Sequence, residues 1–138
     1  MGKIITTIKV VNNEDEIAVK LGVKKQNEIR NLEITNVLVD TGATTLCLPK
    51  SLIRQLGLPI AREVPVETAM GDTFMNVYKN VTIQIMGREG IFECVELPDG
   101  RQPLLGVLPM EGLGIEPNLN KQILELLPTT GPKAYITV

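Results

Sequence analysis

The most constraining feature of the sequence is an aspartate on a short polar stretch, Asp40-Thr41-Gly42-Ala43, between two apolar segments. The run Ile34–Val39 has the pattern of a buried strand and precedes the stretch, and Leu46–Leu48 follows it. A carboxylate in apolar surroundings is unfavourable unless it is hydrogen-bonded or shares a proton. Thr41 offers a hydroxyl donor, and Gly42 tolerates the backbone angles of a tight turn. We therefore predict a tight turn that holds Asp40 in an apolar cleft.

A second motif, Leu104-Leu105-Gly106, lies about sixty residues downstream. Together with the segment Val37–Ala43, it resembles the active-site sequences of the aspartic proteases. The Ala43-Thr44 pair resembles the retroviral (retropepsin) branch more than the two-domain pepsin branch. The resemblance covers roughly residues 30–115 and is closest to cellular, bacterial-type members. It implies that the Leu-Leu-Gly segment crosses behind the loop that carries Asp40.

The resemblance also implies a fold class, an oligomeric state and a mechanism. The expected fold is an all-β, closed β-barrel of the retropepsin type with one or two short helices, in a single domain spanning 1–138. Aspartic-protease chemistry needs two carboxylates in contact that share one proton. The chain has a single Asp-Thr-Gly and, at 138 residues, is too short for a two-lobed enzyme. We therefore predict a homodimer in which Asp40, Thr41 and Gly42 of both copies form the catalytic site.

Two predicted strands, Pro65–Ala69 and Thr73–Tyr78, flank a turn at Met70–Asp72. In position this hairpin resembles the flap, near residues 66–77, that closes over the retropepsin cleft; an ordinary surface hairpin is the alternative. Val107 departs from the family pattern, because many retropepsins carry a basic residue after the Gly. The predicted substrate-binding residues are Ala43, Ala69, Met70, Gly71, Asp72 and Val107.

Elsewhere, β-branched runs separated by Gly, Pro, Asn and Asp predict further strands. A helix over Ser51–Leu56 ends at Gly57, and another over Leu108–Leu113 ends at Gly114. Residues 115–127 fit a helix or a hairpin with a turn at 117–120, and we favour the hairpin. The remaining predicted strands are Lys3–Val11, Ile17–Leu21 after a polar turn at 12–15, Glu28–Val39, Asn80–Ile85, Gly90–Leu97 and Ala134–Val138.

The terminal segments Ile4–Thr6 and Tyr135–Thr137 are candidates for a sheet between the two copies, because similar family members use their termini in this way. The alternative is that both segments pair within one chain.

Composition excludes several kinds of chemistry. The chain has no His, which removes His-based nucleophilic catalysis and His metal ligands. Its two cysteines, Cys47 and Cys94, lie in apolar runs without metal-ligand spacing, so we expect reduced core residues and neither metal nor cofactor. A net charge of −2 without a basic patch argues against nucleic acid. No N-terminal apolar run is long enough for a signal peptide or a membrane span, so we expect a cytoplasmic protein.

These expectations favour an aspartic endopeptidase that cleaves peptide or protein substrates with an activated water. A non-catalytic peptide-binding or dimerisation module with the same fold is the alternative, and it would explain Val107. A β-barrel domain with no site is the third interpretation.

Overall fold

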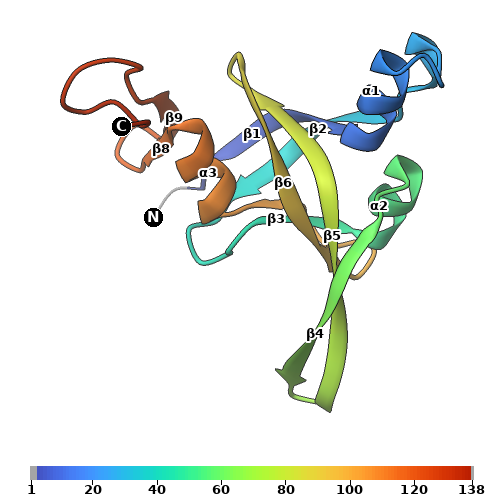
Figure 1. The fold of residues 1–138 in the computed structure, drawn as a ribbon. Coiled ribbons are helices and arrows are strands. Elements are labelled where there is room, and N and C mark those ends of the chain that lie inside the picture. The colour runs from blue at the N-terminus through green and yellow to red at the C-terminus, as the bar shows by residue number, and fades with distance from the viewer. Residues whose placement is uncertain (1–2, 138) are drawn as a thin grey trace.

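The computed structural model describes residues 3–137, and this part of the chain is mostly β (Figure 1). It contains three short α-helices, not the one or two expected from the sequence. The helices are α1 (Asn13–Lys20), α2 (Lys50–Leu56) and α3 (Val107–Leu113), with a 3-10 turn η1 (Gln26–Glu28). The strands are β1 (Ile5–Asn12), β2 (Asn31–Val39), β3 (Leu46–Pro49), β4 (Ile60–Thr68), β5 (Gly71–Ile85), β6 (Arg88–Leu97), β7 (Leu104–Leu105), β8 (Ile115–Asn118) and β9 (Ile123–Leu126).

Seven of the strands form one sheet in the order β1-β2-β7-β3-β6-β5-β4. The strand β1 pairs with β2 along one side and with β5 along the other, so the pairings run round six strands and return to β1. Inward-facing Val, Ile and Leu side chains fill the space between them, because burial of each is favourable by about 1.5–3 kcal/mol. The most completely buried include Val10, Val37, Leu46, Leu48, Ile83 and Leu105.

The predicted strand Ile17–Leu21 is wrong, because this segment belongs to helix α1. The Asn12 side chain caps the helix by accepting a hydrogen bond from the Asp15 backbone N–H at 3.0 Å. Acidic residues fill the first turn, where the positive end of the helix dipole favours them. Ile17 is 47% exposed, so the apolar alternation that suggested a strand does not mark a buried face.

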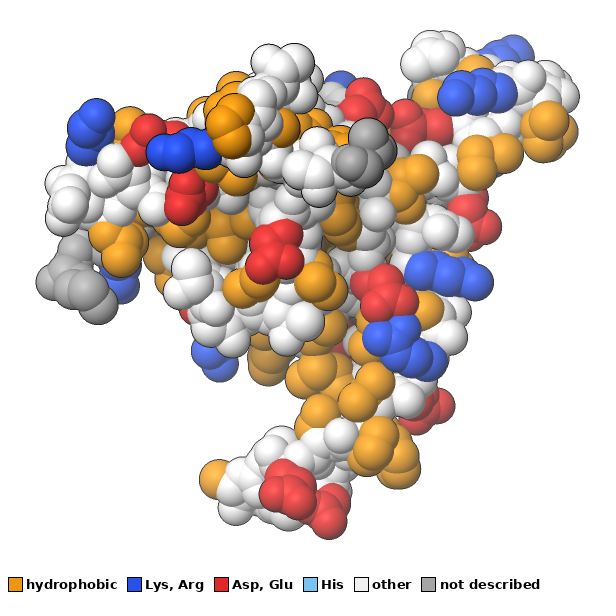
Figure 2. Space-filling model, turned by 60° about the vertical axis from the view of Figure 1, so that its left-hand side comes forward, with side chains coloured by type: hydrophobic (Ala, Val, Ile, Leu, Met, Phe, Trp, Pro, Cys, Tyr) orange, Lys and Arg blue, Asp and Glu red, His pale blue; other side chains and the backbone are white. Residues whose placement is uncertain are grey.

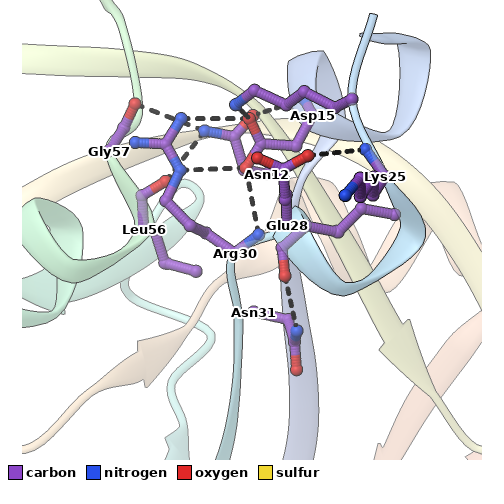
Figure 3. A network of polar contacts seen from close by, with 10 residues as sticks. Asn12, Asp15, Lys25, Glu28, Arg30, Asn31, Leu56 and Gly57 are labelled. Carbon is purple, nitrogen blue, oxygen red and sulfur yellow. Dashed lines mark hydrogen bonds and ion pairs between the residues drawn. The ribbon is translucent and has the colours of Figure 1, made fainter. Parts of the chain in front are cut away.

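A polar network holds α1 against the sheet (Figure 3). Asp15 is 2% exposed, and its carboxylate accepts hydrogen bonds from the backbone N–H and the guanidinium of Arg30 and from Lys24. The Asn12 amide donates to the carbonyl oxygen of Leu56 at 2.8 Å. The network therefore joins α1, the start of β2 and the end of α2.

The hairpin predicted around residues 65–78 is confirmed, with its turn one residue earlier, at Ala69-Met70. The strand β5 continues to Ile85, so the two strands predicted at 73–78 and 80–85 are one. A register shift between Tyr78 and Val81, with Asn80 at φ 60°, bends this long strand where the hairpin leaves the body. In Figure 1 the hairpin β4–β5 projects away from the other elements.

Both predicted C-terminal helix ends are confirmed: Gly57 follows α2 and Gly114 follows α3, each in the left-handed conformation. The hairpin predicted within 115–127 is also confirmed, as β8 and β9. The predicted last strand is wrong for residues 134–137, which contain no strand, and Val138 lies outside the described residues. Within residues 3–137, no helix is both long and apolar enough to span a membrane.

Candidate active site

The site is built on residues 40–45, the loop between β2 and β3, which we call the Asp40 loop. Asp40 follows the last residue of β2, and its backbone N–H donates to the carbonyl oxygen of Leu105 at 3.0 Å. The strand β7 runs parallel to β2, with Leu38 opposite Leu104. The predicted crossing of Leu104–Gly106 behind the loop is therefore confirmed.

The crossing segment ends at Gly106, where there is no room for a side chain. A Cβ atom at this position would lie 2.5 Å from the carbonyl oxygens of both Ala43 and Thr45. Real Cβ atoms do not approach backbone oxygens this closely, so the two backbones can pack only without a side chain here. The next two residues then donate to the loop: Val107 N–H to Ala43 O at 2.9 Å and Leu108 N–H to Thr44 O at 2.8 Å.

The Asp40 carboxylate is positioned by its own turn. Its Oδ1 accepts from the backbone N–H of Gly42 at 2.8 Å, and its carbonyl accepts from Ala43 N–H at 3.1 Å. Asp40 is half-buried and Thr41 is exposed. The expectation of a carboxylate buried in an apolar cleft is therefore wrong for the single chain, because the loop lies at its surface. The hydrogen bond from Gly42 N–H thus fixes Oδ1 of this carboxylate.

Beneath the loop the chain is buried and well bonded. Thr45, which the sequence analysis did not single out, is 6% exposed and donates from its hydroxyl to the carbonyl oxygen of Glu93 at 2.8 Å. Cys47 lies behind it, and burial, with a smaller contribution from the charge of Asp40, raises the pKa of its thiol. Both cysteines are free and buried, as predicted. Neither thiol is therefore exposed at the surface of the Asp40 loop.

A hollow of about 250 Å³ opens beside Thr41, between α3 and the β8–β9 hairpin. Its walls are mainly apolar. The lining residues are Thr41, Val107, Met110, Glu111, Ile115, Glu116, Pro117 and Leu127. The structure thus places Val107 close to the Asp40 loop, as predicted, but at the start of α3 and half-buried.

The remaining predicted binding residues, Ala69–Asp72, are all exposed at the tip of the projecting hairpin. Met70 at the tip is 97% exposed. Among the described residues, no hydrogen bond or ion pair joins this tip to the Asp40 loop, so the structure does not bring the two groups together. In Figure 2 hydrophobic side chains continue from the body onto the hairpin, and acidic ones lie at its tip.

The base of this hairpin is tied to β6 by two polar contacts. Arg62 forms an ion pair with Glu93, and the Tyr78 hydroxyl donates to Glu96 at 3.0 Å. The hydrogen bond to Arg62 lowers the pKa of the Glu93 carboxyl, so this pair stays charged in mild acid. Within the described part of the chain, no cluster of three or more metal-ligating Cys, Asp or Glu side chains occurs.

Comparisons with known proteins found one matching family model and similar solved structures. The family model described as gag-polyprotein putative aspartyl protease matches residues 15–108, well over half of the sequence. The chain therefore belongs to this retropepsin-like family of aspartyl proteases. Among solved structures, the simian foamy virus (mac) protease matches with a TM-score of 0.46 and 24% identity, over 61% of this chain and 90% of that one. No curated protein matches the chain.

Proposed function

We propose that the chain is an aspartic endopeptidase that works as a homodimer of closed retropepsin-type barrels, with Asp40 of each copy in one catalytic dyad. The observation that carries this proposal is the Asp40 loop. Asp40 stands at the end of a core strand, its carboxylate is held by Gly42 N–H at 2.8 Å, and Leu105 and Gly106 brace it from behind. Membership of the aspartyl protease family supports the same reading.

The need for two copies follows from the other three aspartates of the chain. Asp15 is buried in its ion pairs with Lys24 and Arg30, Asp72 lies in the exposed hairpin, and Asp99 is paired with Arg54. In the structure as it stands, none of these three carboxylates is hydrogen-bonded in the Asp40 loop. A dyad with a shared proton therefore needs the Asp40 of a second copy, one carboxylate acting as base toward water and the other polarising the peptide carbonyl.

The β8–β9 hairpin is our candidate for the surface that meets the second copy. Ile5 and Thr6 pair with Leu38 and Val37 of their own chain, and residues 134–137 form no strand, so the expected sheet between termini has no support here. The hairpin instead forms a wall of the hollow beside Thr41. Because Asp40 must lie at the two-fold axis, this neighbouring surface lies near that axis as well.

The register of the hairpin favours β9 as the pairing edge. Leu127 N–H donates to Gly114 O, so the alternate residues Leu124 and Leu126 direct their backbone groups away from β8. On β8, the outward-facing backbone position is Pro117, which has no N–H to donate. The outer edge of β8 is therefore poorly suited to pairing with another strand. We therefore propose antiparallel pairing of β9 with the β9 of the second copy.

In this proposal the β4–β5 hairpin acts as the flap. Peptides with apolar side chains would bind in extended form between its tip, Ala69–Asp72, and the floor at Ala43 and Val107. The cytoplasmic location expected from the sequence remains part of the proposal.

Cleavage of a mixed peptide library at about pH 4, 5.5 and 7 tests the proposal, with Asp40→Asn as the matched variant. Asparagine keeps the oxygen that Gly42 N–H binds, so the fold and the dimer should remain while cleavage disappears. We expect cleavage to be fastest in mild acid. A dimer that binds peptides and cleaves none, in both proteins, would favour the non-catalytic binding module; an equal rate from pH 4 to about 9 would exclude the shared-proton mechanism.

A further inference from the structure

Arg88, the first residue of β6, makes a three-point contact with the C-terminal part of the described chain. Its Nη1 donates to the carbonyl oxygens of Leu113 at 2.9 Å and Gly114 at 3.0 Å, and its Nη2 donates to Leu127 O at 2.6 Å. The first two carbonyls belong to the last residue of α3 and to the glycine that follows it, and the third belongs to the residue directly after β9. One side chain thus fixes the end of the helix and the end of the hairpin relative to each other.

Tyr135 completes the contact from a segment without regular structure. Its ring centroid lies 4.3 Å from the Arg88 guanidinium carbon, within the range of a cation–π interaction. The ring also packs on Gly114, where a Cβ atom would lie 2.2 Å from the tyrosine Cγ. Gly114 is therefore needed both for its left-handed backbone, at φ 64°, and for this close contact.

The helix α3 connects this contact to the Asp40 loop. Its first turn donates to the loop through Val107 N–H and Leu108 N–H, and its last carbonyls are the ones that Arg88 binds. A helix of seven residues has few intrahelical hydrogen bonds, so partners at both ends matter for its orientation. The Arg88 charge also suits the negative C-terminal end of the helix dipole.

We propose that Arg88 and Tyr135 are positioning residues for the catalytic site: they fix the C-terminal end of α3, and α3 in turn holds Ala43, Thr44 and the orientation of Asp40. This inference rests on the proposed function for its kinetic consequences, and on the contacts above for its structural ones.

Four variants test the inference in the full-length dimer. Arg88→Met removes all three hydrogen bonds but keeps a long side chain, and Tyr135→Leu removes the ring. Arg88→Lys keeps one charge, and Tyr135→Phe keeps the ring over the guanidinium. We expect kcat to fall at least tenfold in the first two with KM nearly unchanged, because small misplacements of reacting groups cost large factors in rate. Tyr135→Phe should retain the wild-type kcat, and Arg88→Lys should lie between.

A stability control separates positioning from general loosening. Ile83→Val alters a fully buried residue of β5 that belongs to neither the Asp40 loop nor α3. If Arg88→Met lowers kcat no more than Ile83→Val does, with both proteins folded at the assay temperature, the positioning role is overturned.

A second readout does not depend on activity. Hydrogen exchange at the amides of Val107 and Leu108 reports their bonds to the Asp40 loop directly. We expect these two amides to exchange at least tenfold faster in Arg88→Met and at the wild-type rate in Ile83→Val. Unchanged exchange in Arg88→Met overturns the inference. Faster exchange in a protein that cleaves no peptide would uphold the coupling and reject only the proposed peptidase function.

Discussion

The α-carbon of Gly106 lies so close to Thr45 that a methyl group on it would stand 2.5 Å from the Thr45 carbonyl oxygen. The contact is between two backbones, so neither side can move without shifting a strand. This relationship determines how the crossing segment supports the Asp40 loop.

Gly106→Ala should therefore be strongly destabilising. Because backbone atoms must shift, we expect a loss of at least about 2–3 kcal/mol in the free energy of unfolding. Urea unfolding measures it. Gly112→Ala is the comparison, since its Cβ would meet a side chain, the Phe92 ring at 2.8 Å, and no backbone atom of another segment. A loss at Gly106 no larger than at Gly112 would contradict the close packing.

The helix ends at Gly57 and Gly114 could be predicted from local sequence, because each glycine follows an apolar helical turn. The crossing of Leu104–Gly106 behind the Asp40 loop was predicted from the family resemblance, because nothing local in the two motifs says that they meet.

What the sequence did not predict depends on partners distant in the chain. Asn12 and Asp15 have the spacing of a helix cap, and this signal was available in the sequence. The burial of Asp15 was not predictable in the same way, because it depends on the ion pair with Arg30, which lies 15 residues away. The contacts of Arg88 with the Leu127 carbonyl oxygen and with the Tyr135 ring have no local signal, because both partners lie about 40 residues or more along the chain and a backbone carbonyl leaves no mark in the sequence.

Asp15→Asn should destabilise the protein at neutral pH by about 1–3 kcal/mol, because the buried carboxylate loses its charged partners. The Arg30 hydrogen bonds, and then Lys24, lower the pKa of Asp15 well below its usual range. A lowered folded-state pKa gives stability that is present above the unfolded value of about 3.9 and is lost as pH falls further.

The difference between wild type and Asp15→Asn in urea unfolding should thus shrink below about pH 4. Asp99→Asn is the control, because its carboxylate is 53% exposed and pairs with Arg54, which is 68% exposed. Asparagine also keeps an oxygen that can accept the hydrogen bond from Ser51 N–H. Its substitution should change stability little. An unchanged difference for Asp15→Asn at low pH would contradict the lowered pKa.

Neither thiol should react readily while the protein is folded. Cys94 is completely buried and Cys47 is 8% exposed, and burial raises the pKa of both thiols. Reaction with a chromogenic disulfide reagent at about pH 8 should be slow without urea and should reach two thiols per chain after unfolding. Rapid reaction of one thiol in the native protein would show that the base of the Asp40 loop is open.

The Leu126→Lys variant should weaken the dimer. Leu126 lies on β9 and is 44% exposed, so the substitution costs the single chain little and places a charge at the proposed interface. Sedimentation at several concentrations should show a dissociation constant raised by at least tenfold, about 1.4 kcal/mol. Ile17→Lys, at a 47% exposed position on α1, is the matched control and should dimerise normally. Normal dimerisation of Leu126→Lys would exclude the β9 edge.

Met70→Ser should lower kcat/KM without changing the unfolding midpoint. The side chain is 97% exposed, so in the unliganded chain it contributes almost no burial, and only closure over a peptide would give it contacts. Met86→Ser, at the turn between β5 and β6 and 44% exposed, is the control. Equal kcat/KM in all three proteins would show that the hairpin tip does not touch the substrate.

The contact between Arg88 and Tyr135 has a consequence for synthesis of the protein. Asp40 leaves the ribosome 95 residues before Tyr135, and Arg88 leaves it 47 residues before. The loop and its crossing strand can therefore form on a nascent chain while the far end of α3 is still without its aromatic partner. A nascent chain can make this contact only after Tyr135 has left the ribosome, so the far end of α3 is fixed later than the Asp40 loop that its first turn supports.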